Sequence, residues 1–187
     1  MKKKLILFAG HLASGKTTIS KRIADDLNLT SLNKDDIKEI LAKRIGFKNR
    51  EENLKLSHAT FDMMCYMLER AFKHDEIMIL ESNFKPYELS KIHEIVDALM
   101  IETYTLFLTA EGNILYDRYV IRDQTRDEAH RSTGLLSYDI FLKVMDEYLF
   151  DQTFHDVKID TSYFDDQAYR NLKELIEAFI KKDEQDV

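Results

Sequence analysis

Two patterns of apolar and polar residues alternate along the chain. Short uninterrupted apolar runs are typical of buried parallel strands, whereas apolar residues spaced three and four positions apart are typical of helices. The first pattern predicts strands at residues 4–9, 29–33, 77–80, 103–109 and 156–160. The second predicts helices at residues 15–27, 35–44, 50–73, 86–99 and from 165 onward, with further helices on either side of a lid between the last two strands.

This alternation predicts a three-layer α/β/α fold with a five-stranded parallel sheet. The length of 187 residues, without repeats or linkers, indicates one domain. Within it we expect a helical insert at residues 45–75 and a lid region at residues 112–134. In such folds the functional residues lie at the carboxyl ends of the strands, and the motifs below all occupy such positions.

A complete phosphate-loop motif, GxxxxGK[ST], directly follows the first predicted strand. Its glycines let successive backbone N–H groups point at phosphate oxygens, and the following helix adds the positive end of its dipole. Lys16 is expected to reach the β- and γ-phosphates, and the Thr17 hydroxyl to ligate Mg²⁺. We therefore predict a nucleoside triphosphate site formed by Gly10, His11, Leu12, Ala13, Ser14, Gly15, Lys16, Thr17 and Thr18.

Composition and charge narrow the set of partners. The formal charge of −7 and a pI near 5.4 argue against a broad nucleic-acid-binding surface. The single cysteine, Cys65, cannot form an intramolecular disulfide and suggests a reducing compartment. Because it lies in an apolar helical run, we interpret it as a buried thiol and not a nucleophile.

The N-terminus resembles the start of a signal peptide, with three lysines before an apolar run at residues 5–9. The run is too short for a signal sequence, and it leads directly into the phosphate loop. No other segment approaches the length needed to span a bilayer. The expectation is a cytoplasmic protein with no membrane partner, and the sequence leaves the oligomeric state open.

The second predicted strand ends in Asn33-Lys34-Asp35-Asp36, which matches the guanine-reading NKxD motif. A GTPase carries this motif after a late strand, and no glycine here lies three residues after an aspartate, so a DxxG switch motif is missing too. A carboxylate beside the phosphate loop is better placed to orient an acceptor hydroxyl and take its proton. We expect Asp35 to fill this role and Asp36 to cap the next helix, with the reverse assignment left open.

The central strand ends in Glu81-Ser82-Asn83. A carboxylate at this position commonly holds Mg²⁺ directly or through water, so Glu81 is predicted to join Thr17 at the metal, although a purely structural role is equally open. Asn83 is predicted to contact the substrate.

Arg118, Arg122 and Arg126 recur every fourth residue in the lid region. A helix would stack these three like charges on one face, which is unfavourable unless an anion compensates. The functional interpretation is a lid that closes over the triphosphate, with Arg118 binding the nucleotide and Arg122 and Arg126 stabilising the transferring group. The alternative is a solvated helix paired with nearby aspartates.

Three blocks, GHLASGKTT, LNKDDIKEILA and LESNFKPYE, resemble the P-loop kinases of the polynucleotide-kinase-like branch, a group of P-loop NTPases that also contains many small-molecule kinases. The resemblance implies a fold of the nucleoside-monophosphate-kinase type. It also implies that Asp35 acts on the acceptor hydroxyl, that Lys38 contacts the acceptor side and that Arg122 stabilises the phosphoryl group. Position 38 is often arginine in this group, and Glu81 stands where aspartate is usual.

These features together predict a kinase that transfers the γ-phosphoryl group of ATP·Mg²⁺ to a hydroxyl of a small molecule bound under the insert. A polynucleotide 5′-hydroxyl kinase is the first alternative, and a nucleotide-hydrolysing switch protein is the second. The identity of the acceptor is not readable from the sequence, because the residues of the insert are generic.

Overall fold

The computed structural model describes residues 3–74, 77–131, 134–147 and 155–182. Residue 75 of the predicted insert, residues 132 and 133 of the predicted lid region, and residues 183–187 of the segment predicted to be helical from 165 onward lie outside the described residues. Five parallel strands form one sheet in the order β2-β3-β1-β4-β5. They are β1 (Lys4–Gly10), β2 (Thr30–Asn33), β3 (Ile77–Glu81), β4 (Glu102–Thr109) and β5 (Val157–Asp160).

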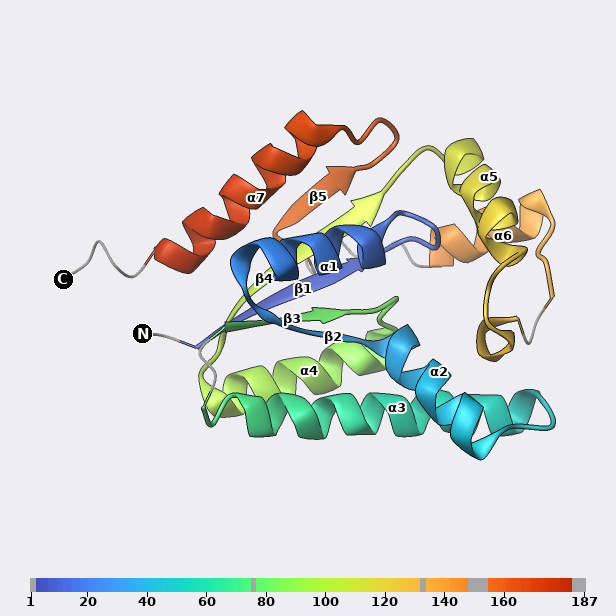
Figure 1. Ribbon diagram of the computed structural model, residues 1–187, viewed down its shortest axis with the longest axis horizontal. Helices are drawn as coiled ribbons and strands as arrows, with labels where there is room; N and C mark the ends of the chain where they lie inside the picture. Colours follow the sequence, from blue (N-terminus) through green and yellow to red (C-terminus); the bar gives the residue numbers. More distant parts are fainter. Residues whose placement is uncertain (1–2, 75–76, 132–133, 148–154, 183–187) are drawn as a thin grey trace.

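Helices cover both faces of this sheet, so the predicted three-layer α/β/α fold is confirmed (Figure 1). Helices α1 and α7 lie on one face, helices α3 and α4 on the other, and α5 and α6 stand at the end where the strands terminate. The helices are α1 (Lys16–Leu27), α2 (Lys34–Ile45), α3 (Arg50–Ala71), α4 (Pro86–Leu99), α5 (Gly112–Asp123), the short 3₁₀ turn η1 (Glu128–His130), α6 (Tyr138–Glu147) and α7 (Asp166–Lys181).

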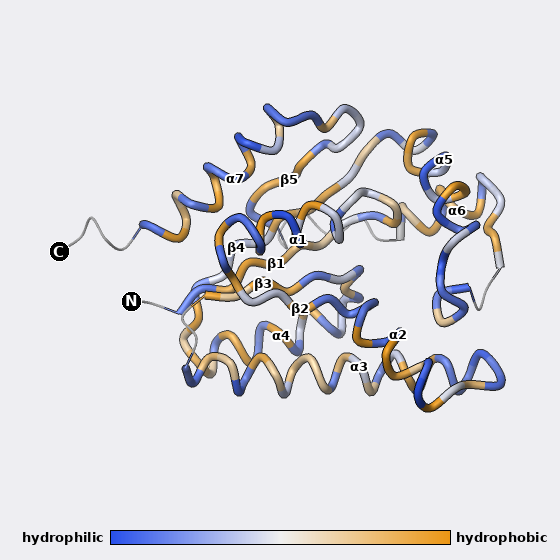
Figure 2. Tube along the Cα trace, viewed as in Figure 1, coloured by the Kyte–Doolittle hydropathy of each residue, from blue (hydrophilic) through white to orange (hydrophobic). Residues whose placement is uncertain are grey.

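The central strand β1 is buried along its whole length and apolar after its first residue, Lys4, because both of its faces are covered (Figure 2). Leu5 and Leu7 pack in the cluster formed with α3 and α4, whereas Ile6 and Phe8 pack in the cluster formed with α1 and α7. This alternation fixes the register of β1 against both neighbours, and it places the phosphate loop at the middle of the carboxyl edge of the sheet.

One helix cap differs from the prediction. We expected Asp35 or Asp36 to cap α2, but the cap is Asn33, whose side-chain oxygen accepts a hydrogen bond of 2.9 Å from the Asp36 backbone N–H. Helix α2 begins one residue earlier than predicted, so both aspartates lie in its first turn. Asp36 instead pairs with Lys21 on the surface, at 2.6 Å.

The structure also tests the expectations for Cys65 and for membrane-spanning segments. Cys65 is buried, and burial raises the pKa of its thiol to about 11, which fits an inert core residue. Across the described part of the chain, no helix has the length and apolar character needed to cross a membrane.

Candidate active site

The phosphate loop needs glycine at both obligatory positions. Gly10 has a φ of +138°, and a Cβ atom there would lie 2.0 Å from the Leu108 carbonyl oxygen on the neighbouring strand. Gly15 has a φ of +82° and forms the N-cap of α1. Any side chain at Gly10 would push the loop off β4, so the tight turn that gathers backbone N–H groups depends on that residue.

The Lys16 side chain is buried, and it turns back toward residues 11–14 of the phosphate loop. Its Nζ donates to the His11 carbonyl oxygen at 2.6 Å and lies 3.4 Å from the Ser14 hydroxyl. Burial lowers the pKa of Lys16, and the nearby Glu81 and Asp35 carboxylates oppose that effect. These two contacts place the amine on the inner side of the loop, which lines the cleft described below, and this is where the motif requires it.

Thr17, Asn33 and Glu81 meet at the ends of three neighbouring elements. The Thr17 hydroxyl donates to Glu81 Oε2 at 3.0 Å, and the Asn33 side-chain amide donates to the same oxygen. Burial raises the pKa of Glu81, although the charge of Lys16 works against this. A hydroxyl and a carboxylate are ligands that fit Mg²⁺, and the metal would take its remaining ligands from phosphate oxygens and water. No group of three or more His, Cys, Asp or Glu side chains that could hold a metal by itself occurs among the described residues.

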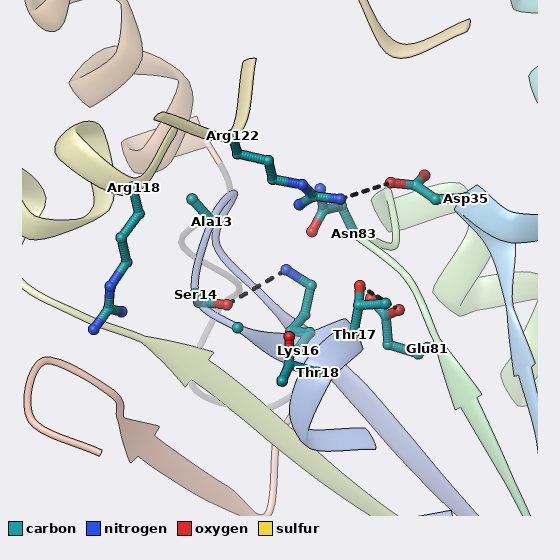
Figure 3. Close-up of a pocket in the computed structure, with 11 residues that line it drawn as sticks. Ala13, Ser14, Lys16, Thr17, Thr18, Asp35, Glu81, Asn83, Arg118 and Arg122 are labelled. Carbon is teal, nitrogen blue, oxygen red and sulfur yellow. Dashed lines mark hydrogen bonds and ion pairs between the residues drawn. The ribbon is translucent and has the colours of Figure 1, made fainter. Parts of the chain in front are cut away.

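A cleft of about 300 Å³ opens over the loop and brings most of the predicted residues together (Figure 3). It is lined by Ala13, Ser14, Gly15, Lys16, Thr17, Thr18, Asp35, Glu81, Asn83, Arg118 and Arg122. We call it the phosphate cleft.

The lid residues converge on Asp35 from across this cleft. The guanidinium groups of Arg122 and Arg126 each lie 3.9 Å from Asp35 Oδ2 (Figure 3 shows the first pair). The two arginines do not share a helix face as expected, because α5 ends at Asp123 and Arg126 follows it in the connection to η1. The two positive charges still lie close together: burial lowers the pKa of Arg126, the charge of Arg122 adds to this effect, and the Asp35 carboxylate between them opposes it.

Arg118 lies on the other side of the loop from Asp35 (Figure 3). Its guanidinium donates to the Thr161 carbonyl oxygen at 2.8 Å and to the Ser162 carbonyl oxygen at 3.3 Å. Arg118 also lines the phosphate cleft, but its guanidinium is already hydrogen-bonded to backbone carbonyl groups of the loop after β5.

Several predicted residues lie outside the phosphate cleft. Gly10, His11 and Leu12 line a smaller cavity next to it. Lys38 donates to the Ala129 carbonyl oxygen of η1 at 2.9 Å, and burial lowers its pKa. The Arg126 side chain is only 13% exposed. The structure therefore brings Lys38 and Arg126 to the Asp35 side of the site without exposing them in the cleft.

His130 is a neighbour of Asp35 that sequence reasoning did not single out. Its side chain is 5% exposed, with Nδ1 3.7 Å from Asp35 Oδ1 and Nε2 3.4 Å from Glu39 Oε1. Burial lowers its pKa, so the neutral ring is favoured. The preceding carbonyl, that of Ala129, accepts from both Lys38 and Asn53, and these bonds hold η1 against α2 and α3. Only the tertiary contact makes His130 notable, because no motif contains it.

The NKxD match is accounted for by local structure. Asn33 caps α2 and holds Glu81, while Lys34 forms a buried ion pair with Glu88. Neither side chain is available to read a base, so the structure gives no support to guanine recognition.

The fold is shared with kinases of known structure. A Chloroflexus aurantiacus protein assigned as a kinase superposes with a TM-score of 0.81 at 20% identity, over 95% of this chain and 98% of that one. Shikimate kinase from Bacteroides thetaiotaomicron gives 0.60 at 18% identity, over 94% and 98% of the two chains. The Mycobacterium tuberculosis APS kinase CysC, solved with AMPPNP and APS, gives 0.64 at 13% identity, over 94% and 98%.

No protein-family model matches the sequence, and no curated protein matches it either. At these identities the structural similarity shows the fold of P-loop kinases.

Proposed function

We propose that the protein is an ATP-dependent kinase that phosphorylates a hydroxyl group of a small molecule. One observation carries the proposal: a single cleft holds the phosphate loop, an aspartate beside it and an arginine from the lid. These are the three parts that phosphoryl transfer to an alcohol needs, namely a phosphate cradle, a group that orients the acceptor, and a positive charge for the transition state. The fold shared with shikimate and APS kinases supports the same activity class.

In this proposal each part of the site has a defined task. The loop N–H groups and Lys16 bind the β- and γ-phosphates, and Asp35 accepts the hydrogen bond of the acceptor hydroxyl and takes its proton as the new P–O bond forms. Arg122 leaves Asp35 and stabilises the charge on the transferred group, with Arg126 as its buried neighbour. In the absence of substrate, the two arginines stabilise the Asp35 carboxylate.

Thr17 and Glu81 would hold Mg²⁺, the first directly and the second directly or through water. When bound, the ion neutralises charge on the phosphate oxygens and helps to orient them in line with the acceptor. Asn33 keeps the Glu81 carboxylate aimed at Thr17.

The acceptor side is formed by Asp35, Lys38 and Asn83 together with the helical insert at residues 45–75. A polynucleotide 5′-hydroxyl is the less favoured acceptor, because a polynucleotide requires a basic groove and this chain carries a net charge of −7. A nucleotide-hydrolysing switch is the second alternative, and it differs from a kinase in that no acceptor stimulates its turnover.

Acceptor-dependent release of ADP is the deciding measurement. Wild-type protein with ATP·Mg²⁺ is screened against small hydroxyl compounds and a 5′-hydroxyl oligonucleotide, with Lys16→Ala as the nucleotide-site control. We expect ADP release to rise with a small-molecule acceptor in the wild type, and ATP affinity to fall in Lys16→Ala without loss of the fold. Turnover that no acceptor stimulates would support the switch instead, and efficient labelling of the oligonucleotide would support the polynucleotide kinase.

A further inference from the structure

A second, smaller cavity of about 80 Å³ adjoins the phosphate cleft. It lies between the start of the phosphate loop and helix α6, and Asn83 lines both spaces. Its walls include His11, Leu12, Asn83, Phe141, Val144 and Met145. A molecule that fills this cavity therefore lies directly beside the phosphate cleft, with Asn83 between the two.

Two polar side chains, those of His11 and Asn83, line the cavity. His11 is 5% exposed, and its Nε2 makes no hydrogen bond of normal geometry within the described residues, although the Met145 backbone lies close enough to the ring to oppose the lowering of its pKa by burial. The Asn83 Oδ1 atom is likewise buried and unpaired there. Buried polar atoms in folded proteins are nearly always paired, because leaving one unpaired is unfavourable. Two such atoms at one cavity indicate a ligand that carries a hydrogen-bonding group between them.

The orientation of the imidazole is fixed by its surroundings. His11 Nδ1 lies 2.8 Å from the Thr109 hydroxyl, and the ring packs edge-on against Phe107 with centroids 5.0 Å apart. Burial lowers the pKa of His11 to about 4, and the charges of Lys16 and Lys158 act in the same direction, so the ring is neutral at physiological pH. A hydroxyl suits both atoms, because it can donate to Asn83 Oδ1 and exchange a hydrogen bond of either sense with His11 Nε2.

The remaining walls are apolar. Phe141, Val144 and Met145 face the cavity from α6, and Leu12 faces it from the loop. A charged group would lose its hydration there without an ion partner, which disfavours anionic and cationic ligands. The volume is about half that of a 150 Å³ cavity that holds benzene, so it accommodates about three or four non-hydrogen atoms.

We propose that this cavity holds the non-reacting end of the phosphoryl acceptor, and that the acceptor is a small neutral alcohol whose second hydroxyl stands beside a compact apolar group. The inference rests on the proposed kinase activity, because it places the reacting hydroxyl at Asp35 while the second hydroxyl binds His11 and Asn83. The transfer itself forms one P–O bond at the reacting hydroxyl, breaks the bond between the β–γ bridging oxygen and the γ-phosphorus, and passes the hydroxyl proton to Asp35.

Three matched probes test the ligand class by binding. The first, 3-methylbutane-1,3-diol, has a primary hydroxyl and a second hydroxyl flanked by two methyl groups. Propane-1,3-diol lacks the methyl groups, and 3,3-dimethylbutan-1-ol lacks the second hydroxyl. Binding is followed by NMR of methyl-labelled Val144 and Met145, with a non-hydrolysable ATP analogue and Mg²⁺ present. We expect saturable shifts with the first probe, and at least roughly tenfold weaker binding of the other two, since each lacks one contact.

Variants on α6 provide the control. Val144→Phe fills the cavity and should abolish the response of the Met145 methyl, whereas Ile140→Phe, at a half-exposed position outside the cavity, should keep it. Met145→Phe serves the same purpose if Val144→Phe does not fold, with Val144 as the reporter. Binding of the ATP analogue should be unchanged in all three variants.

The inference would be overturned if propane-1,3-diol bound as tightly as the first probe, or if no probe gave a saturable shift. It would also be overturned by a full response in a folded cavity-filling variant. The kinase proposal is judged separately by ADP release. If another acceptor stimulates ADP release but does not shift the methyl signals of Val144 and Met145, the protein is a kinase whose acceptor does not enter this cavity. Binding of the first probe, together with a screen in which no hydroxyl compound stimulates ADP release, would contradict the proposed kinase activity while supporting the ligand class of the cavity.

Discussion

Asp35 is the residue at which the phosphate loop and the arginines of the lid region come together. Its carboxylate lines the phosphate cleft and lies within 4 Å of lid groups from Arg122, Arg126 and His130. The two guanidinium groups and the imidazole orient this carboxylate toward the phosphate cleft, where a general base has to stand.

Replacing Asp35 by asparagine should therefore keep nucleotide binding and lower the rate of phosphoryl transfer by about a hundredfold, the lower end of what loss of a general base costs. Asp36→Asn is the matched control, because Asp36 lies one position further on the same helix turn and only pairs with the exposed Lys21. Single-turnover rates and ATP affinities of both variants decide the point. A larger loss of rate in Asp36→Asn would exchange the two assignments.

The burial of His11 predicts how stability changes with pH. The pKa of His11 is lowered to about 4 from the ordinary value of 6.5, so between these values the unfolded chain binds a proton that the folded chain does not. Stability from the neutral ring is present above pH 6.5 and is lost as the pH falls toward 4. Glu81, whose pKa is raised by burial, acts in the opposite sense.

A comparison of variants isolates the histidine, because Glu81 contributes equally to both proteins. The loss of unfolding free energy between about pH 7 and about pH 5 should be larger in the wild type than in His11→Gln, by roughly 1–2 kcal/mol. Urea unfolding at the two pH values measures it. The same loss in both proteins would contradict the burial of a neutral ring at this position.

Among the elements, η1 is the one that couples the lid to the acceptor side. It is a single 3₁₀ turn, and its Ala129 carbonyl oxygen is held by Lys38 of α2 and Asn53 of α3, each at 2.9 Å. Because Arg126 and His130 flank this carbonyl, the position of η1 sets the position of the groups around Asp35.

Asn53→Ala should release η1 from α3 and lower turnover more than nucleotide affinity, with a loss of stability of about 1 kcal/mol from the missing hydrogen bond. Asn49→Ala offers a control on the same helix, since Asn49 caps α3 and should cost about the same stability without touching η1. Kinetic constants and urea unfolding of the pair provide the test. Equal turnover in the two variants would reduce the contact between η1 and α3 to a structural role.

At the scale of the whole molecule, the charge distribution argues for a small acceptor. The chain carries 27 Lys and Arg against 34 Asp and Glu residues. Lys43 of α2 pairs with Glu39, and Lys55 of the insert pairs with Glu51, so part of the positive charge where a polynucleotide would run is offset by neighbouring carboxylates.

The affinity for the acceptor should therefore change little with ionic strength, whereas a polynucleotide substrate would lose affinity steeply as its released counterions are opposed by salt. The apparent KM of the identified acceptor, measured from low to physiological salt and above, checks this expectation. A steep increase in KM with salt would instead indicate several phosphate contacts and favour the polynucleotide alternative.

The sequence by itself determined the fold and the nucleotide side of the site. Apolar runs and helical spacing predict the strands and helices to within one or two residues at most ends, because a parallel sheet covered on both faces imposes a simple local pattern. The phosphate loop is local in the same way, since its glycines, Lys16 and Thr17 are contiguous and their geometry follows from one turn.

Only the tertiary structure decided the acceptor side. Asn33, and not an aspartate, caps α2 through its side-chain oxygen, and its amide nitrogen also donates to Glu81 on the neighbouring strand. His130, Arg126 and the wall of the small cavity formed by α6 come from segments far from Asp35 and His11 in sequence. No local pattern encodes such contacts, because they depend on how the lid and the insert pack across the carboxyl edge of the sheet. The recognition of the acceptor is therefore set by packing between distant elements, whereas the binding of phosphate is set by one continuous stretch of chain.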